Sequence, residues 1–214
     1  VFLPESLTPR RREAQLALQK ESAGETIYAM LKRTGNRLLV SPYFVHTSCV
    51  SSITYMVPRW MGVLLGWGAR DIGLLFGVQG GIMALVQGVL IGPLTAALGE
   101  LTLLRIGIGG LCGGLVVALF AQAPPAMVGA TFLAISGATL CMPILNTIAS
   151  HRTPAAFRGR VLGTTSAAAS WGRVAGPLLT GFTLSSFGYT AAWSGILVMA
   201  CVYLTWALSE PGGD

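Results

Sequence analysis

Six stretches of about twenty residues each, almost free of charged side chains, follow one another along most of this chain. At 1.5 Å per residue, about twenty helical residues cross the ~30 Å hydrocarbon layer of a bilayer. Lipid offers no hydrogen bonds to exposed backbone, and the sequence lacks the short alternating strands of a membrane barrel. We therefore expect an all-α, polytopic membrane helical bundle with six transmembrane helices, placed at 38–58, 72–96, 101–121, 126–149, 161–183 and 189–208.

The composition supports a lipid environment. Hydrophobic residues make up 53% of the 214 positions and charged residues only 10%, whereas soluble domains carry about 25% charged residues. The net charge of +6 gathers in a few short segments, which is typical of membrane topology and lipid contact and disfavours nucleic-acid binding. All four cysteines lie in apolar stretches without metal-ligand spacing, so we expect small buried side chains, no metal and no cofactor; they are Cys49, Cys112, Cys141 and Cys201.

Lysine and arginine predict the orientation and the domain limits. Eleven of the fourteen basic residues lie in the 8–37 segment or near the ends of the third, fourth and fifth stretches. By the positive-inside rule, these positions and the tail at 209–214 face the cytoplasm, in a bacterial inner membrane. The opening VFLPESL suggests that residues 1–7 end a preceding transmembrane helix. We then expect a cytoplasmic central loop at 8–37 and a transmembrane domain at 38–208.

The six stretches divide into two related triplets. Gly92-Pro93-Leu94 recurs 84 residues later as Gly176-Pro177-Leu178, and prolines bracket both the first and the fourth stretch at similar offsets. Because each unit has three helices, the chain enters the second unit from the opposite side of the membrane, and the second copy is therefore inverted. Two inverted three-helix repeats are a signature of secondary transporters.

Polar side chains share one face of the first, second, fourth and fifth stretches, while the other two are nearly all apolar. Four lining helices and two outer helices are the arrangement expected of half a transporter. For serine and threonine, contact between helices is an open alternative to a cavity wall. Our candidates for the substrate cavity are Tyr43, His46, Thr47, Ser51, Gln79, Gln87, Asn146, Ser166, Ser170 and Arg173.

Two of these candidates, Arg173 and His46, have alternative roles. Arg173 lies near mid-membrane, where an arginine costs at least about 2.5–3.5 kcal/mol. It contacts substrate or a gate, or else it bonds backbone carbonyls or extends toward the interface. His46 has a side chain suited to carrying a proton, or it is a hydrogen-bonded packing residue.

The segment from Pro154 to Gly188 resembles the tenth loop and eleventh helix of major facilitator superfamily transporters. There, a proline is followed by Arg-Gly-x-Val-x-Gly and then by Gly-Pro-x-x-x-Gly. VFLPES resembles the end of the sixth helix, and GVQGGIMALVQGVLIGPLTAALGE the eighth helix and its loop. The matching positions of the first segment are Arg158, Gly159, Gly163, Gly176 and Pro177.

The resemblance covers nearly the whole chain, as the C-terminal six-helix half of a twelve-helix fold. It implies a secondary transporter that moves a small molecule by alternating access, through proton-coupled efflux as in the drug and tetracycline antiporters. The implied partners are the substrate, protons, membrane lipids and the N-terminal half of the same transporter. The six stretches hold no membrane-embedded Asp or Glu, so a carboxylate proton carrier would belong to the other half.

One loop departs from the family pattern. The loop after the eighth helix often reads Gly-x-Leu-x-Asp-Arg-x-Gly-Arg. Here Gly92, Leu94 and Gly99 are kept, alanines replace the Asp and Arg, and Glu100 stands at the final Arg. The charge network of that gate is therefore in doubt, which leaves a non-transporting scaffold or sensor as an alternative.

An intramembrane enzyme is the less favoured alternative, and we expect this chain not to be an enzyme. A rhomboid-like protease needs Gly-x-Ser-Gly and a later membrane histidine, and a zinc protease needs His-Glu-x-x-His. Ser136-Gly137 follows Ala134-Ile135, and neither motif occurs.

Overall fold

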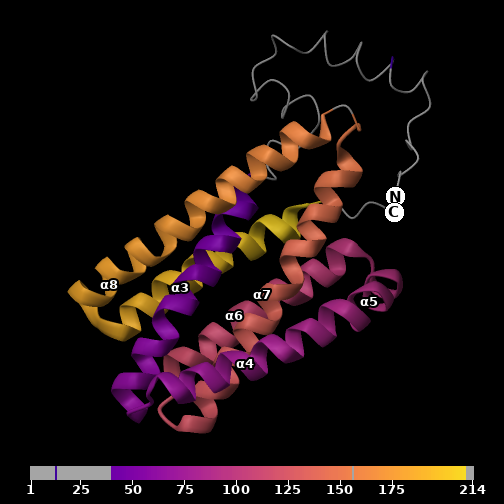
Figure 1. Ribbon diagram of the computed structural model, residues 1–214. Helices are drawn as coiled ribbons and strands as arrows, with labels where there is room; N and C mark the ends of the chain where they lie inside the picture. The colour runs from indigo at the N-terminus through magenta and orange to yellow at the C-terminus, as the bar shows by residue number, and fades with distance from the viewer. Residues whose placement is uncertain (1–12, 14–39, 156, 211–214) are drawn as a thin grey trace, which may run out of the picture.

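The structure is a computed structural model that describes residue 13, residues 40–155 and residues 157–210 (Figure 1). The expectations for 1–7, for most of the 8–37 loop and for the end of the tail lie outside these residues. The described segment from 40 onward is helical apart from short turns. Its helices are α3 (Val40–Leu65), α4 (Ala69–Leu85), the π-helix η2 (Val86–Leu90), α5 (Ile91–Leu98), α6 (Glu100–Phe120), α7 (Pro124–Arg152) and α8 (Arg158–Ser209).

These elements supply the six expected helices. α4, η2 and α5 join into one rod of 30 residues, Ala69–Leu98. α8 is divided at Gly188, where a φ of 82° breaks the helix. We call residues 158–187 the first arm of α8 and residues 189–209 its second arm. The arms double back on each other as a hairpin (Figure 1), so α8 provides the fifth and sixth helices.

Four of the described helices are long and apolar enough to cross a membrane: the Ala69–Leu98 rod, α6, α7 and α8. α3 is not among them, because it carries a run of polar side chains that includes His46, Thr47 and Ser48. These side chains are buried inside the protein. α3 therefore fits the bundle as an internal helix shielded by its neighbours.

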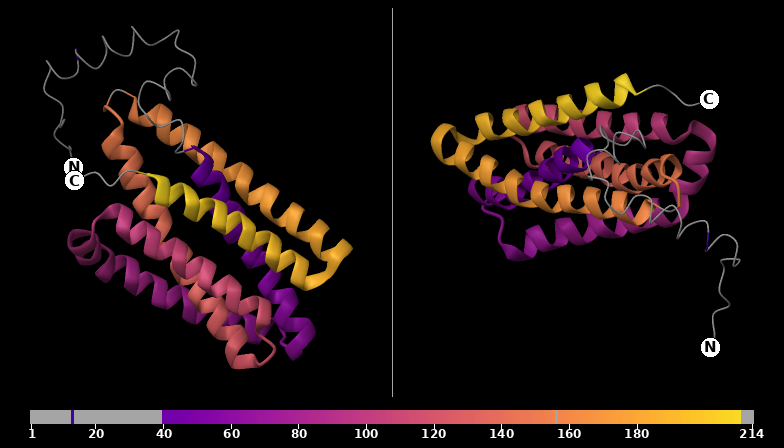
Figure 2. Two further views of the ribbon diagram at one scale, coloured as in Figure 1. Left: turned by 180° about the vertical axis from the view of Figure 1, so that it is seen from behind. Right: turned by 90° about the horizontal axis from the view of Figure 1, so that it is seen from above.

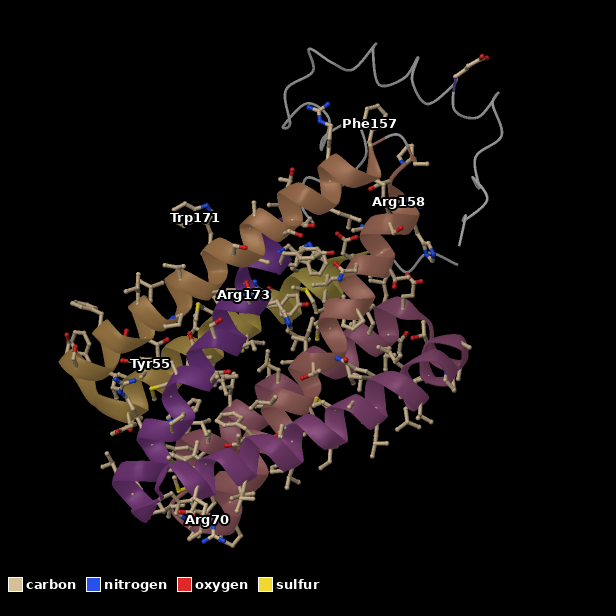
Figure 3. The ribbon with its side chains drawn as sticks, in the orientation of Figure 1. Tyr55, Arg70, Phe157, Arg158, Trp171 and Arg173 are labelled. Atoms are coloured by element: carbon tan, nitrogen blue, oxygen red, sulfur yellow. The ribbon has the colours of Figure 1, made fainter. Side chains whose placement is uncertain are left out.

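The arrangement places α3 between the α8 hairpin and the α6–α7 pair (Figures 1 and 2). The α4–α5 rod lies beyond α6 and α7, on the side away from the first arm of α8. Arg158 and Arg70 mark opposite ends of the bundle (Figure 3). We call these the Arg158 end and the Arg70 end.

Small residues let two helix pairs approach backbone to backbone. A Cβ on Gly176 of α8 would lie 2.9 Å from Ser48 Cα of α3, and one on Gly172 would meet the Phe44 carbonyl. In the α6–α7 pair, a Cβ on Gly114 would lie 2.7 Å from both Ala130 O and Ala134 Cα. Such contacts drive association in lipid, where burial of apolar surface supplies little.

Aromatic rings close the Arg70 end. Trp60 of α3 and Trp193 of α8 are buried, with ring centroids 5.1 Å apart and an interplanar angle of 69°. This edge-to-face geometry is favourable for aromatic pairs. The sequence predicted an end near Pro58, but α3 continues past this proline to Leu65. The helix continues because the turns beyond Pro58 bury Trp60 and Met61.

We predict opposite effects for one substitution at two glycines of α6. Gly114→Ala should lower the free energy of unfolding by about 1–3 kcal/mol, because its methyl group collides with the α7 backbone. Gly109→Ala should be neutral or stabilising by up to about 1 kcal/mol, since nothing lies within 4 Å of its Cβ position. Thermal unfolding in detergent measures both, and equal melting temperatures for the two variants would contradict the packing described here.

Candidate substrate cavity

A polar groove lies between α7 and the first arm of α8. Its volume is about 530 Å³, within the range of small-molecule sites. Unlike the tightly packed helix pairs, it exposes amide, hydroxyl and imidazole groups together. Its lining residues are Asn146, Thr147, Ser150, His151, Leu162 and Ser166.

Tyr43 of α3 is hydrogen-bonded to one of the residues that line this groove. Its ring is buried in α3, and its hydroxyl donates a hydrogen bond of 2.8 Å to Asn146 Oδ1. That bond fixes the Asn146 amide at the groove surface, with the amide nitrogen free to donate elsewhere. The structure thus joins three predicted residues, Tyr43, Asn146 and Ser166, around one polar cavity.

Ser170 and Arg173 lie further along the first arm of α8. Both are exposed, and Ser170 lines a second hollow of about 320 Å³ with Ala167, Trp171 and Val174. Within the described part of the chain, no carboxylate pairs with Arg173. A charged guanidinium at mid-helix needs a polar partner or water in a membrane, so Arg173 remains a candidate for contact with substrate or with the other half.

The remaining candidates on α3 lie inside the six-helix unit. His46 is 4% exposed and packs edge-on against Tyr203, with ring centroids 5.8 Å apart. Thr47 donates to the backbone oxygen of Ala169 at 2.9 Å, which ties α3 to α8. Ser51 is half-buried. These contacts match the helix-packing alternative, and a cavity role for these three residues stays a prediction.

The two glutamines of the α4–α5 rod reach α7. Gln79 Nε2 donates to Ser136 Oγ at 3.2 Å, and Gln87 Nε2 donates to Thr139 O at 3.2 Å. Gln79 is buried, whereas Gln87 is exposed. Both side chains therefore hold the rod against α7, and their contact with substrate stays a prediction.

The residues that match the family motifs lie in three different parts of the structure. Gly92 lines a cavity of about 450 Å³ between α5 and α7, and Leu94 packs on the core at the Arg158 end. Gly99 has a φ of 78°, which suits glycine and turns the chain from α5 into α6. The first turns of α8 present Arg158, Gly159 and Gly163 at the surface, whereas Gly176 and Pro177 belong to the α3–α8 contact region.

A charge network at the Arg158 end was not predicted from the sequence. His151 Nδ1 lies 3.2 Å from Glu100 Oε1, and Arg152 Nη2 lies 2.8 Å from Glu210 Oε2. Arg105 Nε and Nη2 donate to the backbone oxygens of Ala207 and Glu210 at 2.9 and 2.8 Å. These bonds satisfy carbonyls that the end of α8 leaves free.

One feature of the sequence could have pointed to this network. Glu100 and Glu210 are acidic residues at an end of the bundle where basic residues dominate, and each pairs with one of the two adjacent residues His151 and Arg152. Their partners are about 50 positions away in the sequence, so spacing alone could not match them.

This architecture is that of half a twelve-helix membrane transporter. The Major Facilitator Superfamily model matches residues 30–212, and the chain belongs to that family. Its membership and its long apolar helices make it an integral membrane protein.

Two relatives illustrate the match. Over 155 residues the chain is 30% identical to the class G tetracycline resistance protein of Vibrio anguillarum, covering 69% of this chain and 39% of that protein. The structure resembles the crystal structure of the human organic anion transporter MFSD10 (TETRAN), with a TM-score of 0.77 and 18% identity over 94% of this chain. The chain spans 48% of that transporter, so it corresponds to less than half the length of either relative.

We predict that Thr47→Val loosens the α3–α8 contact. The substitution keeps the shape of the side chain but removes the hydroxyl, which lies 2.9 Å from Ala169 O of α8 and 2.8 Å from Tyr43 O of its own helix. Loss of the hydrogen bond between the helices should cost about 1 kcal/mol. Thr54→Val on the same helix is the matched control, because Thr54 Oγ1 is exposed and bonds only to Val50 O of its own helix. Equal melting temperatures for the two variants would show that the Thr47 bond between helices adds no stability.

Proposed function

We propose that this chain forms the C-terminal half of a secondary active transporter that moves a small molecule by alternating access, as proton-coupled efflux. The observation that carries the proposal is the polar groove between α7 and α8, which lies exposed beside the close-packed α3–α8 and α6–α7 helix pairs. Exposed polar groups are costly in lipid, so the groove faces water and the other half of the transporter. A tetracycline resistance protein is among the relatives, which supports efflux.

The proposed topology follows the charges. The Arg158 end, which carries Arg105, Arg152, Arg158 and Arg160, would face the cytoplasm of a bacterial inner membrane together with the central loop. Residues 1–7 would end the preceding helix, 8–37 would form the central loop, and 38–208 would form the six-helix domain. The Arg70 end would face outward.

A non-transporting relative is the second candidate. The alanines at 96 and 97 remove the charged pair of the gate loop. The described structure holds a different contact there, because Glu100 Oε1, at the end of that loop, lies 3.2 Å from His151 Nδ1 of α7. The loop therefore keeps a polar contact with α7, and loss of the charged pair alone does not select the scaffold role.

The cavity role of Arg173 has a direct test. Proton-driven flux of a tetracycline is measured with the full-length protein in vesicles, for Arg173→Ala, Arg173→Lys and the matched control Arg70→Ala. We expect Arg173→Ala to lower flux at least tenfold with normal expression, Arg173→Lys to keep part of it, and Arg70→Ala to keep nearly all. Unchanged flux in Arg173→Ala would make this arginine a structural residue.

A further inference from the structure

His151 lies where the polar groove between α7 and the first arm of α8 meets the start of α6. It belongs to the last turn of α7, lines the groove, and has a side chain that is 70% exposed. Among the described residues that line the groove, it is the one titratable side chain. Histidine changes its charge near neutral pH, whereas amides and hydroxyls do not, so a proton on His151 changes the chemistry of the groove at this position.

Glu100, the first residue of α6, holds one nitrogen of the His151 ring. Its Oε1 lies 3.2 Å from His151 Nδ1. An ionised carboxylate only accepts hydrogen bonds, so the ring nitrogen that faces it carries a hydrogen whether the ring is neutral or protonated. The contact therefore selects the neutral form in which Nε2 is bare, and the proton that His151 gains or loses is the one on Nε2.

Two arginines near this end of the bundle are held by other groups. Arg152, next to His151 on α7, has its Nη2 2.8 Å from Glu210 Oε2. Arg105 of α6 donates to the backbone oxygens of Ala207 and Glu210. Neither arginine is among the residues that line the groove. In the part of the chain that the structure describes, Glu100 is thus the carboxylate paired with the imidazole.

The helices that enclose the groove with α7 bring uncharged groups to it. The first arm of α8 contributes the Ser166 hydroxyl, and Arg158 and Arg160 at its start are not among the lining residues. Tyr43 of α3 acts on the groove through its hydrogen bond to Asn146. A ligand in the groove therefore meets neutral donors and acceptors, and one side chain whose hydrogen-bonding role depends on pH.

The other histidine of this chain has a different setting. His46 is 4% exposed and packs edge-on against the buried Tyr203. A proton reaches the exposed ring of His151 directly from water, whereas it must cross packed side chains to reach His46. Exchange of protons at the groove therefore fits His151 better.

We propose that His151 is the residue at which a proton and the ligand of the groove compete, with Glu100 as the positioning residue that leaves Nε2 to the ligand. This proposal rests on the proposed function and names the proton site that serves it. In the neutral ring, Nε2 accepts a hydrogen bond from an O–H or N–H group of the ligand. In the protonated ring, Nε2 is a donor and that bond is lost. The ligand therefore binds more weakly as pH falls through the range around 6.5 in which imidazoles ordinarily titrate.

The state of the ring is tested without ligand. Nitrogen-15 NMR of the full-length protein, labelled at histidine and placed in nanodiscs, distinguishes a bare ring nitrogen from one that carries hydrogen. The His151 signals are those that His151→Gln removes. At about pH 8.5, where imidazoles are ordinarily neutral, we expect hydrogen on Nδ1 and a bare Nε2. Hydrogen on Nε2 at that pH would overturn the proposal.

Two variants separate the positioning role of Glu100 from a general effect of charge. Glu100→Ala removes the acceptor beside Nδ1, so the neutral ring should become a mixture of its two forms. Glu210→Ala is the matched control, because it removes a carboxylate at the same end of the bundle that pairs with Arg152 instead. It should leave the His151 signals unchanged, and equal changes in the two variants would overturn the role given to Glu100.

The competition is tested with tetracycline as the probe. Its dissociation constant for the full-length protein in nanodiscs is measured at about pH 7.5 and pH 5.5. Relative to His151→Gln, whose amide oxygen accepts hydrogen bonds at both pH values, we expect it to rise about tenfold on acidification, the change that competition with one proton near pH 6.5 produces. Ionisation of tetracycline itself is common to both proteins. The same pH dependence in both would overturn the proposal.

The binding and flux measurements fail independently. Proton-driven flux in a protein whose affinity has the same pH dependence as that of His151→Gln would leave the proposed function standing and overturn this inference. A pH dependence that His151→Gln removes, in a protein that transports nothing, would support the proton site and overturn the proposed function. Lack of saturable tetracycline binding at either pH would overturn both.

Discussion

Contact between helix backbones through small residues is the constraint on which this bundle depends. In lipid, apolar side chains gain little by leaving their surroundings, so helices associate through close van der Waals packing and hydrogen bonds between helices. Gly172 and Gly176 allow α8 to approach α3 closely enough for Thr47 to reach the Ala169 carbonyl. The close approach and the hydrogen bond therefore depend on each other, and the polar side chains of α3 are tolerated because this contact encloses them.

The sequence predicted the number, type and order of the helices, because twenty-residue apolar stretches leave few alternatives in a membrane. Helical periodicity placed Asn146 and Ser166 on polar faces, and the structure brings both residues to one groove; their contact with substrate stays a prediction. It did not distinguish a polar side chain that faces a cavity from one that bonds a neighbouring helix. Thr47 and Gln79 share the chemistry of Asn146, but their contacts depend on which helix lies opposite, and one sequence carries no such information.

The six-helix unit is not equally well packed throughout. α3, α6, α7 and α8 meet through glycines and buried rings, whereas the α4–α5 rod is tied to α7 by the hydrogen bonds of two glutamines. Two separate cavities lie between the rod and α7, one near each end of the rod, in keeping with this looser attachment. Close packing therefore holds α3, α6, α7 and α8 together as one unit, to which the rod is attached more loosely.

The single glycine that closes the α8 hairpin has a mechanical consequence. The first arm extends for 30 residues from Gly188 to Arg158, which is about 45 Å of helix at 1.5 Å per residue. At that length a tilt of about 5° about Gly188 would displace the far end of the arm by about 4 Å. Because Gly172 and Gly176 hold the arm against α3, that helix would move with it. Arg158 begins the arm at that end, next to the buried Phe157 (Figure 3), so the largest displacement would fall at the Arg158 end of the bundle.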